Sequence, residues 1–112
     1  MTTWVRNMVK ARKPHRCVLC YRTIDAGETY LRGTALERGE APRRWIECAH
    51  CSAVQRIYDI QDDSQYDNSM FDDWSQEPRD VTELRHAAGY RMRWRTRGGT
   101  LLPVPTLEAV AA

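Results

Sequence analysis

The sequence predicts a small α+β fold, and three features carry this prediction. Two cysteine pairs of the form C-x2-C, Cys17 with Cys20 and Cys48 with Cys51, enclose 27 residues. The enclosed stretch contains two strand-like runs separated by a turn signal, which is typical of a β-hairpin. The second pair leads directly into apolar residues at helical spacing. Since the chain has 112 residues, we expect one domain with an accessory element.

The first 60 residues are expected to form one metal-binding module. The pattern of large and polar residues from Trp4 to Val9 fits a short strand, and Gly27 and Gly39 mark turns on either side of a hairpin arm. The expected elements, in order, are a strand over 4–9, a tight turn over 17–20, hairpin arms over 28–36 and 43–47, and a helix over 52–60. The two cysteine pairs then lie at the tight turn and at the start of the helix.

The two cysteine pairs are expected to bind one structural zinc ion. Zinc prefers a tetrahedral shell, and two residues between ligands let one tight turn present two sulfurs to the same ion. Two disulfides are the alternative for a secreted chain, and a redox pair is the alternative for either pair alone. Two nearby histidines are weaker candidates, because His15 lies before the turn and His50 sits inside a pair whose cysteines already satisfy the ion.

An enzyme is not expected. Four cysteines close the zinc shell, whereas a catalytic zinc keeps one position open for water. The stretch between Cys20 and Cys48 contains no histidine that could hold a second, hydrolytic metal. The chain also has no glycine-rich phosphate loop and no recognisable nucleophile motif, so we infer no small-molecule substrate.

Charge and hydropathy place few limits on partners. The formal net charge of +2 falls close to zero once four thiolates bind a divalent ion. Trp4 and Val5 are followed at once by Arg6 and Asn7, so the sequence predicts neither a signal peptide nor a membrane span. We therefore expect a cytoplasmic protein.

Two segments carry a family resemblance. The run from Arg12 to Cys20, RKPHRCVLC, followed by IDAGETY from Ile24 to Tyr30, resembles small zinc-binding proteins of bacteriophages, and the wider arrangement resembles treble-clef zinc fingers. The resemblance covers roughly residues 4–60. It implies a zinc knuckle, a hairpin and a helix with the four cysteines as ligands, and host-cell cytoplasm for a protein of phage origin. Treble clefs serve binding, scaffold and nuclease roles alike, so it implies no single function. Tyr21 departs from the pattern, since such knuckles often carry glycine there.

The remaining residues divide into three segments. Residues 59–77 hold seven acidic residues and no basic one, which predicts an acidic, flexible loop over 61–78. The alternative is that Tyr66, Met70, Phe71 and Trp74 dock this segment on the domain. Asp80 is expected to cap a helix over 81–88. Gly98-Gly99 predicts the turn of an arginine-rich hairpin with arms over 90–97 and 100–104, so that residues 79–105 pack on the same domain. Residues 106–112 form a tail.

Nucleic-acid binding is the first functional hypothesis. If residues 90–97 form a strand, four guanidinium groups project from one of its faces and can engage phosphates. Basic residues before the zinc turn extend this surface. The expected nucleic-acid contacts are Arg91, Arg93, Arg95, Arg97, Lys10, Arg12, Lys13 and Arg16. The alternative for the strand is an exposed edge whose charges only prevent edge-to-edge pairing.

The alternative function is that of a small phage-type interaction factor that binds and modulates a host protein. Aromatic and apolar residues embedded among acids favour such a contact. The expected contact residues are Tyr66, Met70, Phe71 and Trp74. The simpler interpretation of this segment is a solvated connection, and we rank nucleic-acid binding ahead of host-protein binding.

Overall fold

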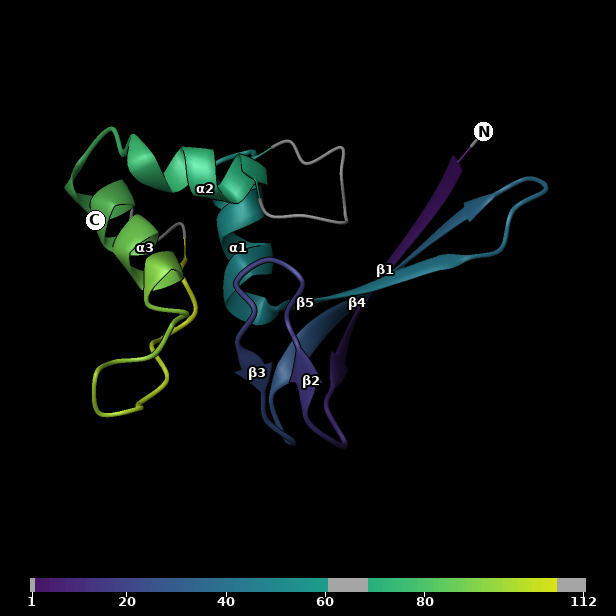
Figure 1. Cartoon of the computed structure of the whole chain (residues 1–112), viewed down its shortest axis with the longest axis horizontal. Helices are drawn as coiled ribbons and strands as arrows, with labels where there is room; N and C mark the ends of the chain where they lie inside the picture. The colour runs from purple at the N-terminus through teal and green to yellow at the C-terminus, as the bar shows by residue number, and fades with distance from the viewer. Residues whose placement is uncertain (1, 61–68, 107–112) are drawn as a thin grey trace.

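The computed structural model describes residues 2–60 and 69–106 and has the predicted α+β class (Figure 1). The elements are β1 (Thr2–Lys10), β2 (His15–Arg16), β3 (Thr23–Ile24), β4 (Thr29–Glu37), β5 (Arg43–Cys48), α1 (Ala49–Ile57), α2 (Ser69–Gln76) and α3 (Val81–Arg91). Among the helices of this described part, none has the length and apolar character needed to cross a bilayer. The tail beyond Thr106 lies outside the described residues.

The larger sheet is antiparallel, with strand order β1-β4-β5, and it confirms the predicted strand and hairpin. Tyr30 on β4 lies opposite Val9 on β1 and Cys48 on β5, so the sheet ends at the cysteines. Its other end projects away from the helices (Figure 1).

One close packing contact holds this projecting sheet together. The Trp45 ring lies over Gly33, where a Cβ atom would overlap it, and it meets Trp4 edge-on with ring centroids 5.9 Å apart. The Trp45 indole N–H donates to Glu47 Oε1 at 2.9 Å. Glycine is therefore required at position 33 to let an indole ring cover the strand.

The smaller sheet pairs β2 with β3 around the first cysteine pair. Cys17 N donates to Arg22 O at 3.0 Å and Tyr21 N donates to Cys17 O at 3.0 Å, which closes the predicted tight turn. Tyr21 takes φ +63°, the left-handed conformation that glycine adopts without strain. Tyr21 thus occupies a turn position at which glycine would fit without strain.

Helix α1 starts three residues earlier than predicted, because Cys48 acts as its N-cap. The Cys48 sulfur accepts from Cys51 N at 3.4 Å, the bond that a serine or aspartate oxygen usually makes. The helix ends at Ile57, and Asp59 follows in the left-handed region at φ +50°. The second cysteine pair therefore belongs to the helix start, as the sequence predicted.

The prediction of a flexible acidic loop is wrong for residues 69–76, which form α2. Phe71 is fully buried, and Ser75, four residues later, is also buried, so one side of α2 packs into the core. Trp74 donates to Glu83 Oε1 at 2.9 Å and ties α2 to α3. Residues 61–68 of the predicted loop lie outside the described residues.

The predicted helix after Asp80 is confirmed, but the predicted strand over 90–97 is wrong. Asp80 accepts from Glu83 N at 2.8 Å, and α3 continues to Arg91. The chain then reverses through Arg93 and Trp94, at φ +56° and +61°, and Trp94 N donates to Gly89 O at 2.7 Å. A turn does form at the glycines, but Gly99 N donates to Thr96 O at 2.9 Å, which centres the turn on Arg97 and Gly98, one residue earlier than predicted. Arg95 and Leu101 make only an isolated bridge.

Candidate metal centre

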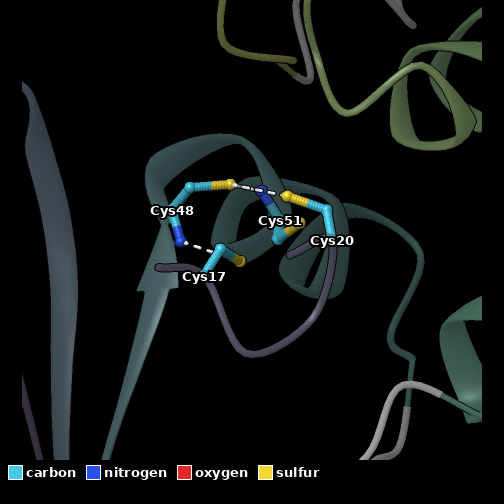
Figure 2. A group of neighbouring side chains, drawn as sticks. All are labelled: Cys17, Cys20, Cys48 and Cys51. Carbon is cyan, nitrogen blue, oxygen red and sulfur yellow. Dashed lines mark hydrogen bonds between the residues drawn. The ribbon is translucent and has the colours of Figure 1, made fainter. Parts of the chain in front are cut away.

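Four buried cysteines converge at one point (Figure 2). Cys17 and Cys20 come from the turn between β2 and β3, Cys48 ends β5, and Cys51 lies in the first turn of α1. Their Sγ atoms all lie within 4.8 Å of one another. Among residues 2–60 and 69–106, no other group of three or more metal-binding side chains is this close. The predicted ligand set is thus brought together in a cluster that can hold a metal ion.

Hydrogen bonds to the sulfurs suit a thiolate centre. Cys17 Sγ accepts from Leu19 N at 3.4 Å and from Cys48 N at 3.3 Å. Cys51 Sγ accepts from the Trp94 indole N–H at 3.3 Å. Because N–H donors stabilise negative charge on sulfur, this shell favours deprotonated cysteines, the form that binds metals.

The pKa values of these thiols show why a cation fits the cluster. Burial raises the pKa of Cys48 and of Cys51, whereas contacts with the sulfurs of Cys20 and Cys48 lower the pKa of Cys17. Four adjacent sulfurs cannot all ionise in a buried site without a positive partner. A divalent ion supplies that charge and couples its own binding to proton release.

A buried arginine lies beside the centre. Arg22 donates from both terminal nitrogens to Glu28, at 2.8 and 3.2 Å. Burial alone would lower the Arg22 pKa, but Glu28 and the nearby Cys48 sulfur together raise it, so the guanidinium stays charged. Arg22 Nε is buried without a hydrogen-bond partner among the described residues. A thiolate centre of net negative charge suits this cation.

His50 is engaged on both ring nitrogens. Arg22 Nη2 lies 3.4 Å from His50 Nδ1, and since a guanidinium can only donate, Nδ1 accepts. Nε2 then carries the proton and donates to the Leu102 carbonyl. His50 therefore links Arg22 to the C-terminal segment and does not compete with the cysteines as a ligand.

The C-terminal segment covers the centre, an arrangement that the sequence did not reveal. The Trp94 ring packs against His50 with ring centroids 5.4 Å apart and contacts Cys51 through its N–H. Arg95 pairs with Asp25 at 2.8 Å and anchors the same segment to the knuckle. The available signal was Gly89, where a Cβ would lie 2.7 Å from the Trp94 ring.

Basic residues line a groove near the turn that holds Cys17 and Cys20. The groove has a cavity volume of about 1180 Å³ and is lined by Val9, Lys10, Ala11, Arg12, Lys13, His15, Tyr30 and Arg32. Three predicted nucleic-acid contacts, Lys10, Arg12 and Lys13, thus lie together. Arg16 does not line the groove. No acidic residue of the described chain lines it.

Arg32 is a groove residue that the sequence analysis missed. It lies on β4 opposite Asn7, on the same face of the sheet as Tyr30. A second cavity of about 410 Å³, lined by Asn7, Arg32, Thr34 and Arg44, shares this residue. The cationic surface therefore continues along one face of β4 toward β5, and the strand pairing was the signal needed to find it.

The four predicted arginines of residues 91–97 do not form a row. Arg91 ends α3, Arg93 lies in the left-handed turn, and Arg95 is held by Asp25 and, at 3.9 Å, by Glu28. Arg97 is exposed next to the glycine turn. The strand geometry that motivated their assignment is wrong, and a nucleic-acid contact by any of them stays a prediction.

The predicted protein-contact residues have separate environments. Met70 is exposed, Phe71 is fully buried, and Trp74 is half-buried against Tyr58 with ring centroids 5.3 Å apart. Tyr66 lies outside the described residues. Phe71 is therefore not available for a contact with another protein, because its side chain is part of the core.

The fold and the site define a small α+β protein with a four-cysteine centre that can hold a metal ion. No protein-family model, curated protein or solved structure matches the chain. The treble-clef and phage resemblances therefore depend on its own residues alone.

Proposed function

We propose that this chain is a non-enzymatic nucleic-acid-binding protein whose treble-clef-like module is held by one structural zinc ion. The phosphate contacts come from Lys10, Arg12, Lys13 and Arg32. The observation that carries this proposal is the groove beside β1 and β4. These four cations line it together, and none of the groove residues in the described part of the chain is acidic.

The sulfur geometry supports zinc as the metal. Zinc–sulfur bonds of about 2.3 Å in a tetrahedron place the sulfurs about 3.8 Å apart. Cys20 Sγ and Cys48 Sγ lie 3.8 Å apart. Soft thiolate ligands also suit zinc better than magnesium or calcium, which prefer oxygen. Four such ligands leave no open position, so the ion serves the fold.

Charge in the groove supports a polyanionic partner. In the described part of the chain, Lys10, Arg12, Lys13 and Arg32 form no ion pair, whereas Arg22 and Arg95 are each paired with carboxylates. Cations without a protein partner are free to contact phosphates. Phosphate contacts supply most of non-specific nucleic-acid affinity, and each one contributes to its salt dependence.

Fluorescence anisotropy with labelled single-stranded and duplex oligonucleotides tests this function. Wild-type affinity is expected to fall steeply between about 50 and about 200 mM salt. The variants Lys13→Glu and Arg32→Glu should each weaken binding, and removal of one phosphate contact should reduce the salt slope by about 0.9 on duplex DNA.

Arg79→Glu is the matched control, because Arg79 is exposed in the segment before α3 and does not line the groove. Circular dichroism and zinc content should be unchanged in all three variants. Equal losses in the control, or no binding by the wild type at low salt, would reject the groove as the nucleic-acid site.

A further inference from the structure

Helix α3 has one buried side and, opposite it, one exposed apolar side. One side, with Glu83, Ala87 and Tyr90, is buried against the rest of the protein. The opposite side carries Val81, Leu84 and Ala88, and these residues together with Met92 at the C-cap are named here the α3 stripe. These residues follow one another at steps of three, four and four, so they lie in one row along the helix.

The α3 stripe is open to solvent. Val81 is 65% exposed, Leu84 54% and Met92 50%, and Ala88 is also exposed. Single exposed apolar residues are ordinary, but a contiguous row along a helix is the pattern by which helices pack on each other. The helix lies at the end of the molecule away from the projecting sheet (Figure 1). A second helix can therefore reach it without meeting β1 or β4.

Charges beside the stripe identify the partner. Asp80 is the N-cap that precedes α3, where it accepts from Glu83 N, and Arg91 is the last residue of the helix, so opposite charges lie at its two ends. Arg85 lies between them on the helix. When two copies of α3 pack antiparallel about a two-fold axis, Asp80 of each copy faces Arg91 of the other. The antiparallel helix dipoles add to this complementarity.

We propose that the chain forms a two-fold symmetric dimer through antiparallel packing of the α3 stripes of two copies. A self-complementary patch of this kind is what a two-fold interface requires. Leu84 and Ala88 lie near the centre of the contact, and the Asp80–Arg91 pairs close its two ends. The interface leaves out every residue that lines the basic groove, so one dimer presents two grooves.

Sedimentation velocity of the metal-loaded full chain tests this proposal. The expected result is a dimer that dissociates on dilution from the high to the low micromolar range. Leu84→Glu should weaken association by at least about 100-fold, because each of the two copies then places one charge in the apolar contact. Leu36→Glu is the matched control, since Leu36 is 40% exposed on β4 and should leave association unchanged.

Two arginine variants test the direction of packing. Arg91→Gln should weaken the antiparallel dimer by removing both pairs with Asp80. Arg85→Gln should not weaken it, because Arg85 of one copy lies near Arg85 of the other copy at the two-fold axis. In a parallel pair, Arg91 of one copy would lie beside Arg91 of the other, so Arg91→Gln would strengthen association, and that outcome overturns the antiparallel arrangement. A monomer at all concentrations, or a dimer insensitive to Leu84→Glu with zinc content and circular dichroism intact, overturns the interface itself.

Discussion

Replacement of Trp94 tests the link between the C-terminal segment and the cysteine centre. The Trp94 side chain is 2% exposed, packs on Gly89 and His50, and donates to Cys51 Sγ. Truncation of a buried tryptophan to alanine costs about 3–5 kcal/mol. Since a domain of this size is stable by about 5–15 kcal/mol, Trp94→Ala should remove a large share of the free energy of unfolding.

Trp94→Phe separates packing from hydrogen bonding. Phenylalanine keeps most of the apolar contact but leaves Cys51 Sγ without its indole donor, a loss of about 1–2 kcal/mol. Trp4→Ala is the control, because Trp4 is 45% exposed and its edge-on contact with Trp45 is worth about 1 kcal/mol.

Urea unfolding followed by circular dichroism at a fixed metal concentration measures these differences, and a metal indicator measures the rate of metal release. Both Trp94 variants should release metal faster than the wild type, and Trp4→Ala should not. If Trp94→Ala costs no more than Trp4→Ala, or if metal release is unchanged, the C-terminal segment does not support the centre.

Three further predictions concern the metal, the sheet and pH. Chelation at neutral pH should unfold the module over residues 4–60, because metal-binding free energy in such sites is largely folding free energy; an unchanged far-ultraviolet spectrum after verified metal loss would contradict this. Gly33→Ala should destabilise the chain by about 1–3 kcal/mol in urea unfolding, since its Cβ overlaps the Trp45 ring. Gly98→Ala is the control and should cost little, because its Cβ meets only Thr96 Oγ1 at 3.9 Å. Equal costs for the two variants would show that the sheet lacks the contact between Gly33 and Trp45. Burial lowers the pKa of His86 below 6.5, and its Nδ1 lies 2.6 Å from the Tyr58 hydroxyl. As pH falls through 6.5 the unfolded chain takes up the proton first, so this contribution is full above 6.5 and lost in acid. The stability advantage of the wild type over His86→Gln in urea should therefore shrink on acidification, and a constant difference would refute this assignment.

The elements predicted correctly are those that local chemistry determines. Two residues between cysteines produce the same tight turn in many contexts, and the cap at Asp80 needs only the next three residues. The hairpin could be predicted because its glycines and its two strand-like runs lie next to each other in sequence. Spacing alone also predicted that the four cysteines lie together.

The wrong strand over residues 90–97 shows where local pattern fails. Arginine at every second position fits a strand, but Tyr90 and Arg91 complete a helix whose end is fixed by Trp94 folding back onto Gly89. That contact depends on Cys51 and His50, more than 40 residues earlier in the chain. Tertiary packing therefore overrode the two-residue period.

The acidic segment was misjudged for a different reason. Its charge suggested a solvated loop, yet Phe71 and Trp74 lie three residues apart on one side of a helix and pack against Tyr90, at 5.5 and 6.3 Å between ring centroids. Two aromatic side chains outweighed the acids around them, because the acids remain on the exposed side of α2.

The positions of the groove residues connect the proposed metal centre to the proposed nucleic-acid surface. His15 lies on β2 two residues before Cys17, and Tyr30 lies on β4 directly opposite Cys48, with their ring centroids 5.0 Å apart in the wall of the groove. His15 thus lies next to the first cysteine pair and Tyr30 next to the second. An ion bound by all four sulfurs would fix the distance between β2 and β4, and with it the separation of Lys13 from Arg32. Without the ion, the four cations would repel one another across an unsupported gap, so the proposed ion would also set the spacing of the proposed phosphate contacts.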